Sequence, residues 1–264
     1  MEDINSFDKV EKCREINLER LGETKIMNCG EIAFIVEYNS SINIVVQFKT
    51  TKELVKSTYS MFRVGEIKSH FTASVYGNGI TGLTTTQDIN GKKLRSYVCW
   101  TSMLQRCYSA KYQKKHFTYV GCEVCDEWKY YSNFKAWFDV NYYEIEDNVM
   151  NLDKDILFKG NKIYSPENCI FAPEKINTLF IKRNVSRGDL PIGVTFRNLK
   201  YQVTCSDNNG KNNHLGSYNN KIKAFNTYKD YKEKLIAAIA NEYKYQIPSS
   251  LYNAMMKYTV DISD

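Results

Sequence analysis

The first third of the chain alternates short apolar runs with polar turns. The runs EIAFIVEY, INIVVQFKT and TASVYG are rich in β-branched and aromatic residues, and NSSIN separates the first two. This pattern predicts a small, curled antiparallel sheet over residues 21–77, preceded over 1–20 by a short amphipathic helix or a loose lead-in. The stretch 78–94 is rich in Gly, Thr and Asn and lacks periodicity, so it predicts a linker.

Residues 95–145 have helical spacing. In SYVCWTSMLQRCYSAKY and YYSNFKAWFDVNYYEI, apolar residues recur mainly every three to four positions and so gather on one face of each predicted helix. Such a stripe belongs to a core far more often than to a binding platform. The first stripe holds Val98, Trp100, Met103, Leu104, Cys107 and Tyr108, and the second holds Phe134, Trp137, Phe138 and Tyr142.

The C-terminal part predicts three short strands and one helix over 191–245. The strands are IGVTFR, YQVTCS and NNHLGSY, and DNNGK between the last two is a strong hairpin-turn signal. A basic linker, 182–190, precedes this module, and a tail without readable chemistry, 246–264, follows it. The core face of the helix is predicted from Ile222, Phe225, Tyr228, Leu235, Ile236 and Ile239.

Composition and charge narrow the class of protein. Hydrophobic residues make up 43% of the 264 residues and charged residues 25%, which indicates a globular chain. The net charge of +6 and the 20 Tyr residues suit a polyanionic partner such as nucleic acid, although an AT-rich genome produces the same composition. There is no run of 18 apolar residues, and the N-terminus lacks an apolar signal core, so a cytoplasmic protein without a membrane span is expected.

The segment LDKDILFKGNKIYSPENCIFAPEKIN, residues 152–177, predicts a strand, a turn and a helix that begins near Pro173. A hairpin followed by a helix can gather side chains onto one divalent ion, which polarises a phosphate while a base activates water. Asp153 offers the hard oxygen that magnesium prefers, and Asn177 can reach back toward the hairpin. Asn168 can pin the hairpin loop. The alternative is that these side chains only cap and brace turns.

Four of the eight cysteines predict a structural zinc site. Cys122 and Cys125 form a Cys-x-x-Cys pair, and four thiolates in tetrahedral geometry hold zinc. The alternative is that these residues are small buried hydrophobic groups in a reducing compartment. The predicted ligand set is Cys107, Cys122, Cys125 and Cys169.

The central segment resembles the HNH, or ββα-metal, endonuclease motif. SPENCIFAPEKIN is similar to its second half and LDKDI to its first half, and the wider stretch resembles HNH-related proteins encoded by phages. The resemblance implies metal-ligand roles for Asp153 and Asn177, a bracing role for Asn168, and bound Mg²⁺. The chain departs from the family at Lys154, which stands where the general-base histidine is expected. A protonated lysine cannot accept a proton from water, so Asp155 is a substitute base.

The C-terminal module resembles the apetala-type (ethylene-response-factor) DNA-binding domain. The features that match are a Gly-Val that opens the first strand, a Tyr in the second, HLGSY in the third and an Ala-Phe…Tyr helix. The resemblance implies that the sheet lies in a major groove and that the module binds duplex DNA alone. With one Arg and no Trp at the groove-facing positions, sequence specificity is expected to be modest; the alternative is a sheet that binds protein or nothing. The implied groove-facing residues are Thr195, Arg197, Gln202, Thr204, Asn213 and His214, with Lys200 and Lys211 on phosphates.

Together these features predict an α+β fold with three small modules. They are an N-terminal β module (1–77), a central HNH-like ββα-metal domain (95–181) and a C-terminal three-stranded sheet packed on one helix (191–245). The function expected is that of a phage or mobile-element DNA-binding protein in the cytoplasm of a bacterial host, as a monomer or a homodimer, that hydrolyses DNA phosphodiesters with a divalent metal. A catalytically inactive DNA-binding regulator and a protein-interaction factor such as an anti-defence protein stay open as alternatives.

Overall fold

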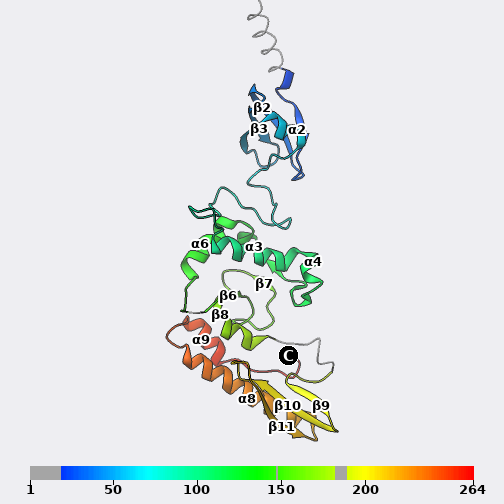
Figure 1. Ribbon diagram of the computed structural model, residues 1–264, viewed down its shortest axis with the longest axis vertical. Helices are drawn as coiled ribbons and strands as arrows, with labels where there is room; N and C mark the ends of the chain where they lie inside the picture. Colours follow the sequence, from blue (N-terminus) through cyan, green and yellow to red (C-terminus); the bar gives the residue numbers. More distant parts are fainter. Residues whose placement is uncertain (1–18, 147, 182–188) are drawn as a thin grey trace, which may run out of the picture. The chain divides into compact units, whose positions relative to one another are not determined.

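The computed structural model describes residues 19–146, 148–181 and 189–264. Within them, helices combine with four small sheets, so the predicted α+β class is confirmed (Figure 1). The chain divides into two compact units. The first contains Met1–Val120 and Val124–Ala136, and the second contains Gly121–Glu123 and Trp137–Asp264. No helix in these described ranges combines the length and the apolar character needed to cross a membrane.

The N-terminal part of the first unit is the predicted antiparallel sheet, with its strands in sequence order. Two register shifts interrupt the pairing of its second and third strands. Its core is apolar and includes Ile35, Val46 and Phe48, and helix α2 (Tyr59–Val64) adds Phe62. The strands are β1 (Thr24–Ile26), β2 (Ile32–Ser40), β3 (Asn43–Phe48) and β4 (Leu54–Ser57).

The segment TASVYG does not extend this sheet, so its prediction as a strand was wrong. An isolated bridge joins Val75 to Gly79 instead, and the Thr72 hydroxyl donates to the buried Glu31 carboxylate at 2.6 Å. The start of the stretch predicted as a linker is packed, because a Cβ added to Gly79 would lie 2.4 Å from Leu104 Cδ1, whereas residues 87–93 are exposed. Long-range contacts that composition does not reveal therefore decide the course of this segment.

Helix α3 (Arg95–Tyr108) carries the predicted apolar stripe into a buried core. Trp100 is buried, and its Nε1 donates to the backbone oxygen of Trp128 in α5 (Asp126–Lys129) at 2.7 Å. Val98 is 46% exposed, so its assignment to the stripe was wrong. Two residues turn a helix by about 200°, which places Val98 opposite Trp100. The other elements of this region are α4 (Ala110–Gln113), η1 (Phe117–Tyr119), β5 (Glu123–Val124) and α6 (Tyr131–Asn141).

The second unit contains the predicted strand, turn and helix of the central segment. Strand β6 (Met150–Asp153) pairs antiparallel with β8 (Ile170–Pro173), and the loop between them carries β7 (Ile163–Tyr164). Helix α7 (Glu174–Asn177) begins directly after Pro173, as predicted, and leads into η2 (Thr178–Phe180). The segment thus forms a small ββα arrangement.

Three further strands of the second unit form the predicted C-terminal sheet, in the order β11–β10–β9. The DNNGK turn is confirmed: Asp207 N donates to Lys211 O at 2.9 Å, and Asn208 and Gly210 have positive φ. The other turn uses Asn198 and Leu199, with φ of 51° and 60°. The strands are β9 (Val194–Arg197), β10 (Lys200–Ser206) and β11 (Asn212–Tyr218).

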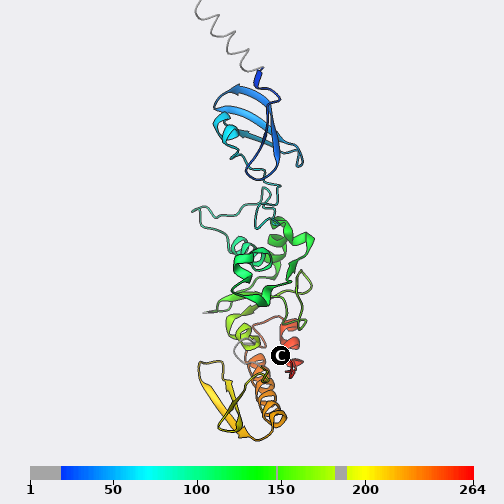
Figure 2. The same cartoon turned by 90° about the vertical axis from the view of Figure 1, so that its right-hand side faces the viewer.

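Helix α8 (Lys221–Glu242) belongs to two cores at once. Its first half packs Phe225 and Tyr228 against the C-terminal sheet. Its second half packs Ile236 and Ile239 with residues of β8, α7 and α9 (Ser249–Met256), so the segment predicted as a tail contains a packed helix. Figure 2 shows α8 beside the sheet and continuing toward α9. Ile222, predicted in the core, is 52% exposed in the first turn of α8.

The contact between Gly193 and α8 gives a stability prediction. Gly193 has φ +74°, and a Cβ there would lie 1.9 Å from Tyr228 Cδ2. Gly210 also has positive φ, but nothing lies within 4 Å of a Cβ at that position. Gly193→Ala should therefore lower the free energy of unfolding by about 2 kcal/mol or more beyond the roughly 1 kcal/mol expected for Gly210→Ala. Urea unfolding measures both, and equal losses would contradict this packing.

Candidate functional site

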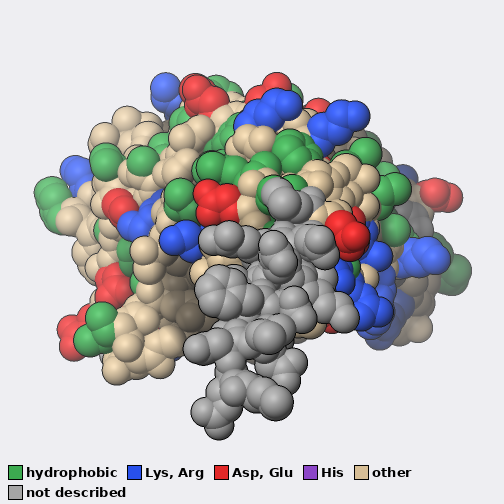
Figure 3. All heavy atoms as spheres, turned by 90° about the horizontal axis from the view of Figure 1, so that it is seen from above, with side chains coloured by type: hydrophobic (Ala, Val, Ile, Leu, Met, Phe, Trp, Pro, Cys, Tyr) green, Lys and Arg blue, Asp and Glu red, His purple; other side chains and the backbone are tan. Residues whose placement is uncertain are grey.

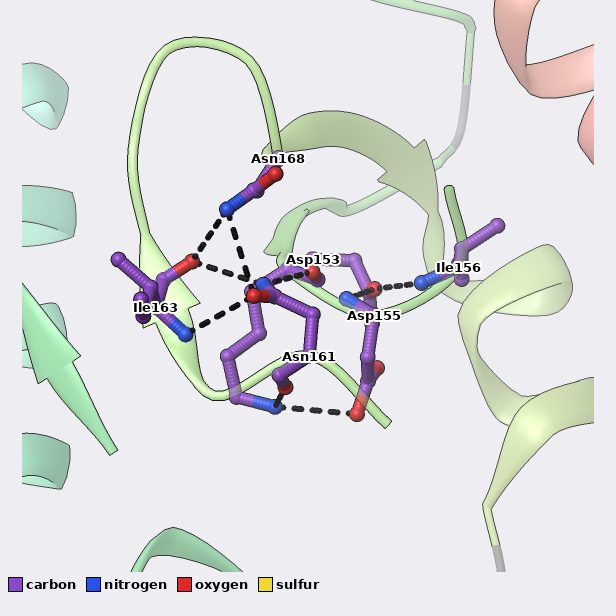
Figure 4. A network of polar contacts seen from close by, with 7 residues as sticks. Asp153, Asp155, Ile156, Asn161, Ile163 and Asn168 are labelled. Atoms are coloured by element: carbon purple, nitrogen blue, oxygen red, sulfur yellow. Dashed lines mark hydrogen bonds and ion pairs between the residues drawn. The ribbon is translucent and has the colours of Figure 1, made fainter. Parts of the chain in front are cut away.

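Asp153 is the last residue of β6 and closes the turn that follows it. Its Oδ1 accepts the backbone N–H groups of Asp155 and Ile156, both at 2.8 Å (Figure 4). Opposite it in the pairing stands Ile170 of β8. One carboxylate oxygen is thus engaged by the turn, which is the bracing role weighed as an alternative to metal binding.

The environment of Asp153 disfavours its charge. Burial, together with the neighbouring Asp155 carboxylate, raises the pKa of its carboxyl to about 6, and the two backbone N–H groups offset only part of this rise. Two carboxyl groups that repel each other gain when a cation lies between them. The predicted metal ligand Asp153 thus has a second carboxyl group, that of Asp155, as its neighbour.

Lys154, at the position where the resemblance expects a histidine, is a buried structural cation. Its Nζ donates to Asp155 Oδ2 and to the backbone oxygen of Asn161, each at 3.0 Å. Burial acts to lower the pKa of Lys154, but the Asp155 carboxylate outweighs it and leaves the pKa above its ordinary value. Lys154 is therefore an ammonium at neutral pH, and Asp155, the predicted substitute base, is its ion-pair partner.

Asn161, which sequence reasoning missed, holds the loop between the two strands together. Its Nδ2 donates to Lys154 O at 2.6 Å and to Ile163 O at 2.8 Å, and its Oδ1 accepts Ile163 N at 3.1 Å. Asn168 Nδ2 donates to Asn161 Oδ1 at 3.3 Å and to Ile163 O at 3.4 Å, which is the bracing geometry predicted for it (Figure 4). Asparagine in the KGNK turn was the available signal, because this residue bonds to nearby backbone in turns.

Asn177, the second predicted metal ligand, is the last residue of α7. Helix α7 packs against both β6 and β8, so Asn177 and Asp153 belong to the same ββα arrangement. Asn177 is half-buried, whereas its neighbour Ile176 points into the core and is fully buried. Its role as a metal ligand stays a prediction.

The four cysteines predicted to bind zinc are divided between the units. Cys107 and Cys125 lie in the first unit, and Cys122 and Cys169 lie in the second. Burial raises the pKa of the Cys122 thiol, and the nearby Lys154 ammonium offsets part of that rise. Among the described residues, no group of three or more His, Cys, Asp or Glu side chains is placed to hold a metal ion. The zinc site therefore stays a prediction that elemental analysis decides.

A second candidate site is the face of the C-terminal sheet that α8 does not cover. The strand register places Gln202 between Thr195 and Ser217, and Thr204 opposite His214. Arg197 and Lys200 are paired at the end of the β9–β10 hairpin. These positions alternate with the buried residues of the other face, as the period of a strand requires. All of them are exposed except Gln202, which is half-buried: Thr195, Arg197, Lys200, Thr204, His214 and Ser217.

Asn213 was wrongly assigned to this open face. Its Nδ2 donates to Tyr231 Oη of α8 at 2.9 Å, so it points to the covered side. Asn213 and His214 are adjacent in β11, and adjacent residues of a strand point to opposite faces. His214 keeps its predicted position, and Lys211 is exposed in the turn before β11.

The open face is polar and positively charged. The residues on this face, from the Arg197–Lys200 pair to the Ser206–Asn212 pair, include two cations, Arg197 and Lys200, and no Asp or Glu. On the surface drawn in Figure 3, by contrast, acidic and basic side chains are intermixed. An acid-free face with amide, hydroxyl and guanidinium groups at strand spacing suits a polyanion that is read by hydrogen bonds.

No protein-family model matches the chain, and no match is found among curated proteins or among solved structures. The resemblances to the HNH motif and to the apetala-type domain therefore stay predictions. The observed geometry is a braced ββα arrangement, in which the buried Lys154 pairs with the half-exposed Asp155, joined through α8 to an open polar sheet.

The raised pKa of Asp153 gives a prediction on pH. The folded-state pKa of about 6 exceeds the ordinary 3.8, so as the pH rises the unfolded chain loses this proton before the folded chain does. Asp153 therefore lowers the free energy of unfolding as the pH rises from 3.8 to about 6. The amide introduced by Asp153→Asn still accepts the two backbone N–H groups but does not titrate. The free energy of unfolding of this variant, minus that of the wild type, should therefore rise by about 1–3 kcal/mol as the pH rises through this interval, and it should stay constant at higher pH. Urea unfolding at several pH values measures this, and a pH-independent difference would contradict the assignment.

Proposed function

We propose that this protein binds duplex DNA through the open face of the β9–β10–β11 sheet. The observation that carries the proposal is the acid-free polar face itself, whose opposite side is covered by α8. A twisted three-stranded sheet fits a major groove and presents alternate side chains to base edges. The face contains groups suited to this task, including a guanidinium at Arg197 and an amide at Gln202.

The groups on the sheet divide by what they can contact. Arg197 can donate two hydrogen bonds to a guanine, and Gln202 can pair with an adenine. Lys200 and Lys211, which lie at the two turns, suit phosphates. Because the face has one arginine, we expect modest sequence specificity, with much of the affinity coming from phosphate contacts.

The sheet is fixed to the ββα arrangement, so the DNA-binding unit is larger than 191–245. Asn208 in the β10–β11 turn donates to Lys175 O at 2.6 Å, and Thr178 donates to Asn208 Oδ1 at 3.1 Å. The second half of α8 is buried against β8, α7 and α9. An isolated 191–245 fragment would expose that apolar surface, which revises the expectation that the module binds alone.

Loss of the two base-reading side chains tests the proposal. Arg197→Ala should weaken binding to duplex DNA by about 1–3 kcal/mol, and adding Gln202→Ala should weaken it further. Arg63→Ala, at an exposed position of α2, removes the same charge elsewhere and serves as the control. Fluorescence anisotropy with the full chain at fixed salt measures all three. If the Arg197→Ala/Gln202→Ala variant binds like the control, the sheet is not the DNA-reading surface.

The second candidate function is metal-dependent hydrolysis of DNA at Asp153. The observation that favours it is the Asp153 carboxyl beside that of Asp155: burial raises the pKa of Asp153, repulsion by Asp155 raises it further, and a divalent ion would relieve that repulsion. Such an ion would polarise a phosphodiester for attack by water. The ion pair holds Lys154 as an ammonium, which cannot accept a proton, and engages Asp155 Oδ2, which weakens Asp155 as a base. This pairing favours a DNA-binding regulator, with cutting dependent on another base.

Nicking of supercoiled DNA with Mg²⁺ or Mn²⁺ separates these two functions. Lys154→His should cut faster than wild type, because an imidazole with a pKa of about 6.5 is mostly neutral above pH 7 and accepts a proton. Adding Asp153→Asn should abolish that cutting while DNA affinity stays the same. Cutting by wild type but not by Lys154→His would instead assign Lys154 to the reaction. If both proteins bind DNA and neither cuts it, the result would favour a DNA-binding regulator over a nuclease.

A further inference from the structure

Residues 110–119 of the first unit, called here the α4–η1 platform, lie in the most basic stretch of the chain. Between Asp88 and Glu123 there are seven Lys and Arg residues and no Asp or Glu. The platform consists of α4, η1 and the three residues between them. It lies outside both sites described above, and a surface with this charge attracts polyanions.

Three lysines of the platform carry charges that the described part of the chain does not neutralise. Lys111, Lys114 and Lys115 are exposed, and none of their ammonium groups makes a hydrogen bond or ion pair with a described residue. Lys111 lies in α4, and Lys114 and Lys115 lie in the turn that continues it, so their spacing of three and four positions brings like charges close together. A chain of phosphates along this turn would relieve that repulsion.

Aromatic rings lie in a row next to these lysines. The ring of His116 is stacked on Tyr112, with 4.4 Å between ring centroids and 29° between planes. Tyr119 lies 5.9 Å from Tyr112, centroid to centroid, and the Arg106 guanidinium lies over the Tyr119 ring. The row ends in solvent, because His116 is exposed and the next ring, Phe117, is 59% exposed. A flat base can continue such a stack.

The platform is held rigid by one amide. Gln113 Nε2 lies within hydrogen-bond distance of Cys107 O at 2.7 Å, Arg106 O at 3.1 Å and Tyr119 O at 3.3 Å. Ser109 caps α4 through the backbone N–H of Tyr112. These contacts hold the backbone of the platform, and with it the positions of its rings, before any ligand arrives, which lowers the entropy lost on binding.

We propose that the α4–η1 platform binds single-stranded DNA, with its phosphates on Lys111, Lys114 and Lys115 and an unpaired base stacked on the exposed rings of His116 and Phe117. In a duplex, the faces of the bases are hidden inside the stack, so exposed rings favour an unpaired strand. Lysine is a point charge without the planar fork that reads guanine, so the contact is independent of sequence. This surface is separate from the sheet and does not depend on it.

The test uses the full chain and a fluorescent oligothymidylate, with affinity measured by anisotropy over a series of salt concentrations. Lys111→Gln/Lys114→Gln/Lys115→Gln should lower the slope of log affinity against log salt by about 2, at roughly 0.7 per phosphate contact. The control, Lys49→Gln/Lys52→Gln/Lys56→Gln, changes exposed lysines of the same unit and also takes the net charge from +6 to +3. An equal change in slope for both variants would overturn the proposal.

A second variant leaves the lysines in place. His116→Ala/Phe117→Ala should weaken binding to the oligothymidylate by at least about fivefold through lost stacking. Arg197→Ala/Gln202→Ala should leave this binding unchanged, whereas it weakens binding to the duplex. If single-stranded binding falls only with the sheet variant, the platform proposal is wrong and the sheet proposal stands. Tighter binding of oligouridylate than of oligothymidylate would overturn the assignment to DNA.

Discussion

The second unit depends on a single long helix that is buried in two different cores. The first half of α8 covers the C-terminal sheet, and its second half completes the core of β8, α7 and α9. Neither core can lose α8 without exposing apolar surface, so the sheet and the ββα arrangement fold as one body. The Asn208 contacts with Lys175 and Thr178 add a polar link between the same two parts. DNA held on the sheet would therefore have a fixed position relative to Asp153.

The polar network at Asp153 engages the groups that a hydrolytic site would need free. A buried ammonium and two carboxyl groups satisfy one another and the surrounding backbone: Lys154 pairs with Asp155, and Asp153 closes the turn. In this ion pair Lys154 is protonated and cannot act as a base, and Asp155 Oδ2 is engaged by the ammonium. A cation there would still gain from the two carboxyl groups, because burial and Asp155 raise the pKa of Asp153. The same residues that brace the loop thus decide whether the arrangement can cut.

Features that depend on local sequence were predicted well. Alternation and the DNNGK signal gave the C-terminal hairpin, and the position after Pro173 gave the start of α7. Features that depend on distant contacts were not. TASVYG has strand composition, but Thr72 bonds to Glu31 instead, and nothing in the helical period of α8 shows that its two halves meet different partners. The same holds for the candidate site. The contacts of Asn168 match the bracing role predicted for it, whereas the hydrogen bonds of Asn161 form only in the folded loop.

The central claim is that DNA contacts the open face of the β9–β10–β11 sheet. The most direct test is an NMR titration of the isotope-labelled full chain with duplex DNA, followed through backbone and side-chain signals. We expect the largest changes at Arg197, Gln202, Thr204 and His214, with small changes at Asn213, which bonds to α8 on the covered side. Binding of the duplex with unmoved signals along the three strands would contradict it.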